Sequence, residues 1–354
     1  MTVKKYHTYD EIMAQPNVWR NVYKDIISDN GADLSIFNKT YDEILLFGCG
    51  SSYNLAMSAA FFTRTFLINT CINALPSSEI LINSEIYLNN SKRYLLVGFS
   101  RSGDTTETLE VLNLFKKTKN VNIFTFTCNE DSAITNLSKN SYIIRDAFEQ
   151  SIVMTASFSS MLFAYCLIIS KFLENKNILK DFEDTINFLQ EEISGLDSFI
   201  SDYVARIEFN SYFPLGSEFN YGLAVEADLK MKEMSQINSS SYHLYEFSHG
   251  PKAMIDKKSL CLVLSLNRNL IKYERIIEEL LNLDSHILVV GTNKIKNIPP
   301  CKKIEFVLYN LRLKNDLIKS FINIPVFQFL AFYKTIKNEL DPDHPRNLVY
   351  TVKI

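Results

Sequence analysis

The chain has 354 residues, 47% of them hydrophobic and 22% charged, with a formal net charge of −3 at pH 7. This length suits two domains of ordinary size better than one core, and the composition is typical of a soluble globular protein. Because a chain of this charge has no overall basic field, a nucleic-acid-binding role is disfavoured.

The N-terminus, MTVKKYHTYDEIMAQP, lacks the apolar core and the small-residue cleavage site of a secretory signal. The longest apolar runs, such as MLFAYCLII at 161–169, are shorter than the ~20 residues that a membrane span needs. The six cysteines are scattered, mostly within apolar segments, and none forms a CxxC pair. We therefore expect a cytoplasmic protein with reduced core thiols and no contact with a membrane.

Short apolar segments alternate along the chain with longer amphipathic ones, which predicts βα units and parallel sheets. Residues 160–205 are expected to form a helical connection, and residues 8–30 and the tail from about 317 to form further helices. The expected strands are EILLFG (43–48), RYLLVGFS (93–100), VNIFTFT (121–127), SYFPLG (211–216), SLCLVLS (259–265) and SHILVVG (285–291).

The second half of the chain repeats the plan of the first. Three pairs of matching segments occur in the same order in the two halves. The second and third pairs are FS at 99–100 with LS at 264–265, and Asn129 with Asn293. We predict an α/β fold of two duplicated doubly wound parallel-sheet domains, 1–195 and 196–354, flanked by helices. At an offset of 168, LFGCGSSYNLA (46–56) over PLGSEFNYGLA (214–224) matches Gly48 with Gly216, Tyr53 with Tyr221, Leu55 with Leu223 and Ala56 with Ala224.

Two hydroxyl-rich segments follow predicted strands, FSRSGDTTE (99–107) and GCGSS (48–52). In doubly wound sheets, ligands bind outside the carboxyl ends of the strands. Gly103 can adopt a positive φ, and hydroxyls beside a helix N-terminus make an anion site that suits phosphate. Neither segment completes a nucleotide-binding glycine motif, which favours a sugar phosphate. The alternative is an ordinary turn in which Asp104 and Glu107 form a helix capping box.

These segments resemble the sugar isomerase (SIS) domain family, in the tandem arrangement of the isomerase half of glucosamine-6-phosphate synthase. The resemblance covers nearly the whole chain. It implies a homodimer that binds a sugar phosphate, with active sites at the subunit interface. The segments that carry it are YDEIMAQPNVWR (9–20), FGCGSSY (47–53), SRSGDTTET (100–108), VEADLKMKEMSQINSSSYHLYEFSHGP (225–251) and HPRNLVYTV (344–352).

Within the family, Arg101 and SIVMTASFSSM (151–161) look closer to the galactosamine-6-phosphate deaminase/isomerase group. The synthase's amidotransferase half is absent from this sequence, so glutamine-dependent synthesis is not expected. Tyr350 stands where the synthase has an imine-forming lysine, which leaves a proton-shuttling route. The resemblance implies that the substrate is bound by Gly50, Ser51, Ser52, Ser100, Arg101, Ser102, Gly103, Thr105, Thr155 and Ser157.

Glu226, Lys230 and Glu233 fall on one face of a predicted helix, at i, i+4 and i+7, and His249 follows in SHGP. With the resemblance, Glu233 is our candidate base for moving a proton between C1 and C2. His249 is the candidate for opening the sugar ring, and the family implies that it reaches the site from a neighbouring subunit. Lys230 is expected to steady the oxyanion or simply to pair with Glu233.

The alternative for the helix face is a solvated stripe of ion pairs. No cluster has metal-ligand spacing, so no metal and no cofactor is expected. The leading function is aldose–ketose isomerisation of a phosphorylated amino sugar, with or without release of ammonia. Fructosamine-6-phosphate deglycation, a non-catalytic phosphosugar sensor and a Rossmann-type oxidoreductase are the alternatives. In the second half, SLNRNL (265–270) lacks glycine, so we expect only the first half to hold phosphate.

Overall fold

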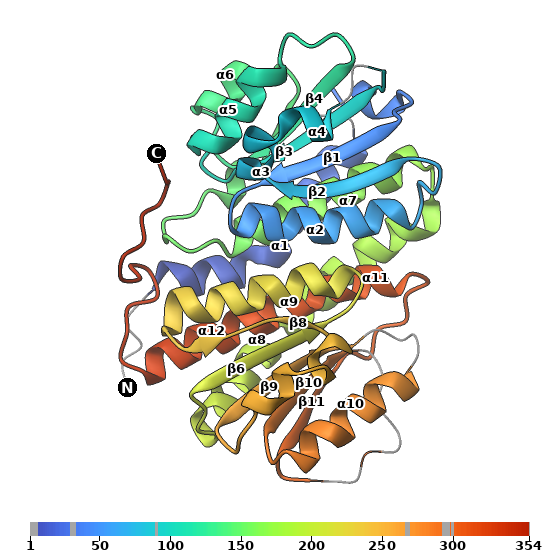
Figure 1. The fold of residues 1–354 in the computed structure, drawn as a ribbon. Helices are drawn as coiled ribbons and strands as arrows, with labels where there is room; N and C mark the ends of the chain where they lie inside the picture. The colour runs from blue at the N-terminus through green and yellow to red at the C-terminus, as the bar shows by residue number, and fades with distance from the viewer. Residues whose placement is uncertain are drawn as a thin grey trace. The chain divides into compact units, whose positions relative to one another are not determined.

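The computed structural model describes residues 6–28, 33–88, 91–265, 270–291, 298 and 301–353. The chain forms two compact units, each built on one parallel β-sheet (Figure 1). The first unit comprises Ala14–Glu183 and Asn347–Ile354, and the second comprises Met1–Met13 and Asp184–Arg346.

The sheet of the first unit has the strand order β2-β1-β3-β4-β5, and every pairing is parallel. The three strands expected in this half are confirmed. The edge strands β2 and β5 were not predicted, because partly exposed edge strands lack a continuous apolar run. In chain order the strands are β1 (Glu43–Gly48), β2 (Cys71–Pro76), β3 (Tyr94–Phe99), β4 (Val121–Thr127) and β5 (Ser141–Ile143).

Helices cover both faces of this sheet (Figure 1). One face packs against α3, α5 and α6 through a cluster that includes Leu45, Phe47, Val111 and Ile134. The other face is covered by α2 and α7, and α7 is buried along most of its length. The helices are α1 (His7–Ile27), η1 (Ser35–Asn38), α2 (Ser51–Arg64), α3 (Ser77–Ile82), α4 (Ser84–Tyr87), α5 (Thr106–Phe115), α6 (Ala133–Leu137), η2 (Arg145–Ala147), α7 (Ala156–Phe172) and α8 (Lys176–Arg206), of which α1 and α8 continue across the unit boundary.

The second unit repeats this topology. Its sheet has the order β11-β10-β9-β6-β7, with β8 also paired to β6. Counting β6, β7, β9, β10 and β11 as first to fifth, both sheets read 2-1-3-4-5, which is the flavodoxin-like order. The predicted duplicated α/β fold is therefore confirmed. The strands are β6 (Ser211–Gly216), β7 (Asn238–Ser239), β8 (Tyr242–His243), β9 (Ser259–Leu264), β10 (His286–Gly291) and β11 (Ile304–Leu308).

The helices of the second unit also lie on both faces of its sheet. A core cluster that includes Phe213, Val263, Ile277 and Val289 joins one face to α10, while α9 and α12 pack together on the other. The helices are α9 (Phe219–Lys230), the π-helical turn η3 (Met231–Ser235), η4 (Glu246–Ser248), η5 (Pro251–Met254), α10 (Leu270–Asn282), α11 (Asp316–Lys319), η6 (Ser320–Ile322) and α12 (Asn323–Lys337).

All six cysteines are free thiols. Cys128, Cys166 and Cys261 are buried in the cores as expected, whereas Cys71 and Cys301 are exposed because they lie at or before the start of the edge strands β2 and β11. Within the described residues, no helix combines the length and apolarity that crossing a membrane would require.

Candidate functional site

The turn between β1 and α2 in the first unit has a tightly specified backbone. A Cβ atom on Gly48 would lie 2.7 Å from the carbonyl carbon of Ser52, so the strand can approach the helix only at a glycine. Gly50 has φ 54° and ψ −126° and directly precedes α2. Ser51 and Ser52, the first residues of α2, are 5% and 4% exposed. These serines therefore lie where the first N–H groups of α2 lack intrahelical acceptors.

The hydroxyl turn, which we define as residues 100–105, connects β3 to α5. Ser100 Oγ accepts a hydrogen bond of 3.1 Å from the Gly103 N–H, and Ser102 Oγ accepts one of 3.2 Å from the Asp104 N–H. Gly103 has φ 70°, and a Cβ atom there would lie 2.2 Å from Ser132 Oγ. Thr105 is the residue before α5, and its Oγ1 lies 3.3 Å from Ser100 Oγ. The turn is a compact nest of hydroxyls beside a helix N-terminus.

Both turns lie at the same edge of the sheet. Strands β1 and β3 are neighbouring and parallel, with Phe47 opposite Gly98, so their carboxyl ends are adjacent. Hydroxyls and N–H groups from two helix N-termini at one edge suit a dianionic phosphate.

The capping-box alternative for Asp104 and Glu107 is not what the structure shows. Asp104 Oδ1 accepts a hydrogen bond of 2.8 Å from the N–H of Ala133, the first residue of α6. Thr105 is the N-cap of α5, and its side chain makes no capping bond. Asp104 therefore ties the hydroxyl turn to a different helix and leaves the start of α5 open to a ligand.

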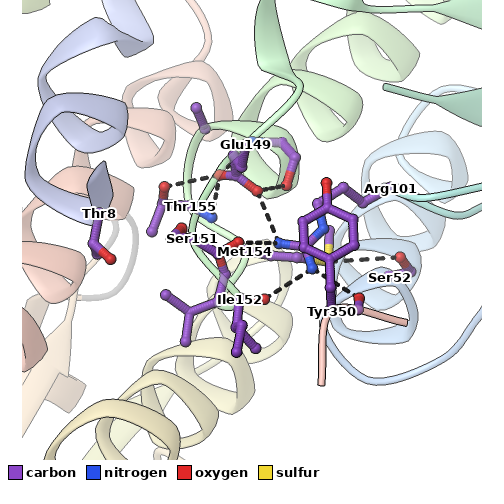
Figure 2. A network of polar contacts seen from close by, with 12 residues as sticks. Thr8, Ser52, Arg101, Glu149, Ser151, Ile152, Met154, Thr155 and Tyr350 are labelled. Atoms are coloured by element: carbon purple, nitrogen blue, oxygen red, sulfur yellow. Dashed lines mark hydrogen bonds and ion pairs between the residues drawn. The ribbon is translucent and has the colours of Figure 1, made fainter. Parts of the chain in front are cut away.

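Arg101 is committed to protein contacts in the first unit (Figure 2). Its side chain is 5% exposed and forms an ion pair of 3.2 Å with Glu149. The two terminal nitrogens also donate to the carbonyl oxygens of Ser151, Ile152 and Tyr350, at 3.3, 2.8 and 3.1 Å. The guanidinium carbon lies 4.0 Å from the centroid of the Tyr350 ring. Its predicted contact with substrate stays a prediction.

Glu149 organises the segment that contains Thr155 and Ser157. Its side chain is fully buried. Oε1 accepts hydrogen bonds from the Thr155 N–H and hydroxyl, at 2.7 and 2.8 Å, and from the Ser157 N–H at 3.1 Å, while Oε2 accepts one of 2.5 Å from the Ser157 hydroxyl. Glu149 was not predicted from the sequence, because no local pattern marks a carboxylate whose partners are supplied by a folded loop. Both hydroxyls predicted to bind substrate thus donate to Glu149.

In the second unit, Lys230 is fully buried between two carboxylates. Its Nζ lies 3.3 Å from Glu226 Oε1 and 2.5 Å from Glu233 Oε2, and the Glu226 side chain is also fully buried. Burial lowers the pKa of Lys230, but the charges of Glu226 and Glu233 outweigh it and raise the pKa above its ordinary value. The solvated-stripe alternative is therefore wrong for Glu226 and Lys230.

Glu233 lies in the π-helical turn η3, which continues α9 and ends at Gln236 in a left-handed conformation, with φ 56°. Its side chain is 20% exposed, unlike the buried Lys230 beside it. Single π-helical turns inside α-helices occur frequently at functional sites. The carboxylate of Glu233 thus contacts a buried cation and is also partly exposed to solvent.

His249 lies on the loop between β8 and β9 and is exposed. The loop is anchored on either side of it, since Ser248 Oγ donates to Glu279 Oε2 at 2.6 Å and Lys252 forms an ion pair with the same carboxylate. Lys252, and then Ser248, lowers the pKa of Glu279. Within the described residues, the imidazole of His249 makes no hydrogen bond to Lys230 or Glu233. Its catalytic role stays a prediction, as does that of Lys230 and Glu233.

The turn expected to lack a phosphate site, 265–270, includes residues that lie outside the described part of the chain. Asn293, which was matched to Asn129, also lies outside it. The absence of phosphate there stays a prediction.

The chain is similar in sequence to known proteins. The sequence matches the family model for the SIS domain over residues 38–171 and 211–301. It is 29% identical over 367 residues to a glutamine–fructose-6-phosphate aminotransferase (isomerizing) of Wigglesworthia glossinidia brevipalpis, an alignment that covers 99% of this chain and 59% of that relative. The chain thus spans about three fifths of the length of the curated relatives it matches.

Two solved structures are similar over almost their whole length. Glucosamine-6-phosphate deaminase of Thermotoga maritima has a TM-score of 0.81 and 27% identity, with 98% of this chain and 100% of that one covered. Tagatose-6-phosphate ketose/aldose isomerase of Escherichia coli has a TM-score of 0.83 and 20% identity, with 96% and 97% covered, which shows a shared fold. The family match covers the first sheet, the strands β6 to β10 of the second sheet, and the turns that follow β1 and β3. The chain belongs to the SIS domain family.

Proposed function

We propose that the protein interconverts the aldose and ketose forms of a 6-phosphorylated amino sugar and, with an amino group at the reacting carbon, releases ammonia. The observation that carries the proposal is the contact of the partly exposed Glu233, in the π-helical turn η3, with the fully buried Lys230 at the end of α9. A buried ion-pair cluster contributes little to stability compared with apolar replacement of all its members together, so a chemical role is the better explanation.

Glu233 would act as the base. Its carboxylate takes the proton from the carbon next to the carbonyl of the open-chain sugar, which gives an enediolate or, with nitrogen present, an enolamine in its deprotonated form. A proton passes from the hydroxyl or amine on that carbon to the former carbonyl oxygen, and returning the first proton to the neighbouring carbon completes the isomerisation. Lys230 would donate a hydrogen bond where negative charge develops on oxygen, while its ion pair with Glu226 keeps it protonated.

The hydroxyl turn and the start of α2 would hold the phosphate. Ser102 Oγ accepts one bond from the turn itself, which leaves its own hydrogen available for an anion. Ser51 and Ser52 add hydroxyls at the next helix N-terminus. These donors would be kept in place by Ser100 and Thr105 and by the two glycines. Gly50 and Gly103 have positive φ angles, which residues with a side chain adopt only with strain.

His249 would exchange protons with the ring oxygen so that a cyclic substrate opens before isomerisation. Its exposure in the single chain is compatible with a partner subunit covering it. We propose a homodimer in which His249 acts in the site of the neighbouring chain.

Deamination follows from the same intermediate. Protonation of the enolamine gives an imine, and water then converts the imine to a ketone and ammonia. The likeness to a glucosamine-6-phosphate deaminase supports this route, and the likeness to a tagatose-6-phosphate ketose/aldose isomerase supports plain isomerisation. Neither reaction requires glutamine hydrolysis. Deglycation of a fructosamine 6-phosphate would pass through a related intermediate.

A non-catalytic phosphosugar sensor is the second candidate. The phosphate turns would serve a sensor equally well, but a sensor has no use for Glu233 beside a buried Lys230. Incubation of the protein with glucosamine, galactosamine and fructosamine 6-phosphates, following ketose, ammonia and free amine, decides between the candidates. We expect turnover by the wild type and none by Glu233→Gln. Tight binding without turnover by the wild type would contradict the enzyme and favour the sensor.

A further inference from the structure

Arg101 connects three segments of the first unit that are distant in sequence. It belongs to the hydroxyl turn, whose serines flank it on both sides. Its terminal nitrogens contact the loop 149–152 through Glu149, Ser151 and Ile152, and the C-terminal segment through the carbonyl of Tyr350 (Figure 2). Two residues beyond this loop, Met154 reaches the turn between β1 and α2, since Ser52 Oγ lies 4.0 Å from Met154 Sδ.

The charge of Arg101 is balanced inside the protein. Its ion pair with Glu149 is buried, with side-chain exposures of 5% and 0%, so the pair as a whole has no net charge to attract an anion. The Tyr350 ring lies over the guanidinium at 4.0 Å, the geometry of a cation–π contact. The planar guanidinium donates from its two terminal nitrogens to backbone carbonyl oxygens of separate segments, and the ammonium group of a lysine could not reproduce this geometry.

We propose that Arg101 is a positioning residue that fastens the C-terminal segment 347–353 and the loop 149–155 to the hydroxyl turn, and that phosphate bound in the turn strengthens this attachment. Phosphate would contact Ser100 and Ser102, the residues on either side of Arg101, and would favour the conformation of the turn that holds Arg101. By linkage, a ligand that favours this conformation also favours the attached segment. The phosphate part of this inference rests on the proposed function, whereas the attachment does not.

A competing explanation is that the Nε–H of Arg101 contacts phosphate directly. Its Nε–H is buried and has no hydrogen-bond acceptor among the described residues. If this N–H contacted phosphate directly, loss of Arg101 would weaken phosphate binding as strongly as loss of Ser102 and would leave the C-terminal segment attached.

The test is removal of the C-terminal segment by trypsin. Arg346 is exposed and is followed by Asn347, so cleavage there releases residues 347–354, which intact mass spectrometry detects. In Arg101→Gln we expect this cleavage to be about tenfold faster than in the wild type, because the charge-assisted hydrogen bond to the Tyr350 carbonyl is lost. Inorganic phosphate should slow the cleavage of the wild type and have no effect on Arg101→Gln.

Two further variants separate the contributions. Tyr350→Leu keeps the Arg101–Glu149 ion pair, so it should fold normally while losing the ring contact, with cleavage about threefold faster. Ser102→Ala should be cleaved at the wild-type rate but lose protection by phosphate. Arg145→Gln, which removes an exposed ion pair with Glu130, is the matched control and should behave as the wild type.

Wild-type cleavage rates in both Arg101→Gln and Tyr350→Leu would overturn the inference, as would full phosphate protection of Arg101→Gln. Where sugar phosphates are turned over, Arg101→Gln should lower kcat more than it raises KM, and Ser102→Ala should do the reverse. If the wild type turns over no sugar phosphate, the proposed function fails, but faster release in Arg101→Gln still supports the attachment.

Discussion

Gly50 and Glu218 adopt nearly the same backbone conformation, with φ 54° and ψ −126° in one and φ 59° and ψ −131° in the other. They stand at the offset of 168 that aligns the two halves of the sequence, and each directly precedes the helix that follows the first strand of its unit. Glycine adopts this conformation readily, and other residues rarely do. The duplicated turn is therefore retained at Glu218 despite a strain of about 1–3 kcal/mol.

The β1–α2 turn should respond differently to alanine at its two glycines. Apart from its chain neighbours, no atom of the described residues lies within 4 Å of a Cβ on Gly50, so Gly50→Ala should cost only backbone strain, about 1–3 kcal/mol of unfolding free energy. Gly48→Ala should cost more, because its Cβ would meet the Ser52 backbone at 2.7 Å. Urea denaturation measures both, and equal losses would contradict this account of the turn.

The buried ion pairs of α9 predict a contrast between two neighbouring lysines. Lys230→Met leaves Glu226 buried without its cation and should lower the unfolding free energy by about 3–5 kcal/mol. Lys232→Met breaks a partly exposed pair with Asp228 and should cost less than about 1 kcal/mol. A small loss for Lys230→Met in chemical denaturation would show that Glu226 is protonated or solvated.

Glu233→Gln should abolish turnover and preserve binding of sugar phosphates, because the amide keeps the shape of the side chain but cannot accept a carbon-bound proton. Initial rates and calorimetric titration measure the two properties. The control is Glu278→Gln on the exposed face of α10, which should be fully active. Residual turnover above about 1% of wild type would argue against Glu233 as the base, given that positioned bases contribute 10²–10⁴-fold.

Ser102→Ala should raise KM for phosphosugars with little change in kcat, since it removes one hydrogen bond to a charged group, worth roughly 1.5–3 kcal/mol. Ser198→Ala, on the exposed side of α8, should leave the kinetics unchanged. A crystal soaked in phosphate should show density beside residues 100–105. Density beside 265–270 instead would refute the assignment of phosphate to the first half.

His249→Asn should slow turnover of cyclic substrates more than that of analogues fixed in the open chain. If His249 acts in the site of a neighbouring subunit, dimers that mix this variant with Glu233→Gln should regain activity, because one hybrid site receives both intact residues. Co-expression with two affinity tags isolates the mixed dimers. Inactive mixed dimers would place His249 in the site of its own chain.

The sequence by itself determined the repeated βα plan and the hydroxyl turns. Buried strands such as 43–48 and 211–216 appear as continuous apolar runs, and Gly48 and Gly216 mark where each strand meets its helix. The i, i+4 and i+7 spacing of Glu226, Lys230 and Glu233 was enough to place them on one face. These features are local, so neighbouring residues alone specify them.

Only the tertiary structure decided what these residues contact. Arg101 pairs with Glu149 and with the carbonyl of Tyr350, 48 and 249 positions away, and Asp104 binds the N–H of Ala133 rather than capping its own helix. The π-helical turn that holds Glu233 and the short edge strands also lack a local sequence signal. Such contacts depend on how the chain folds back on itself, because a buried polar group takes whichever partner the packed core brings to it.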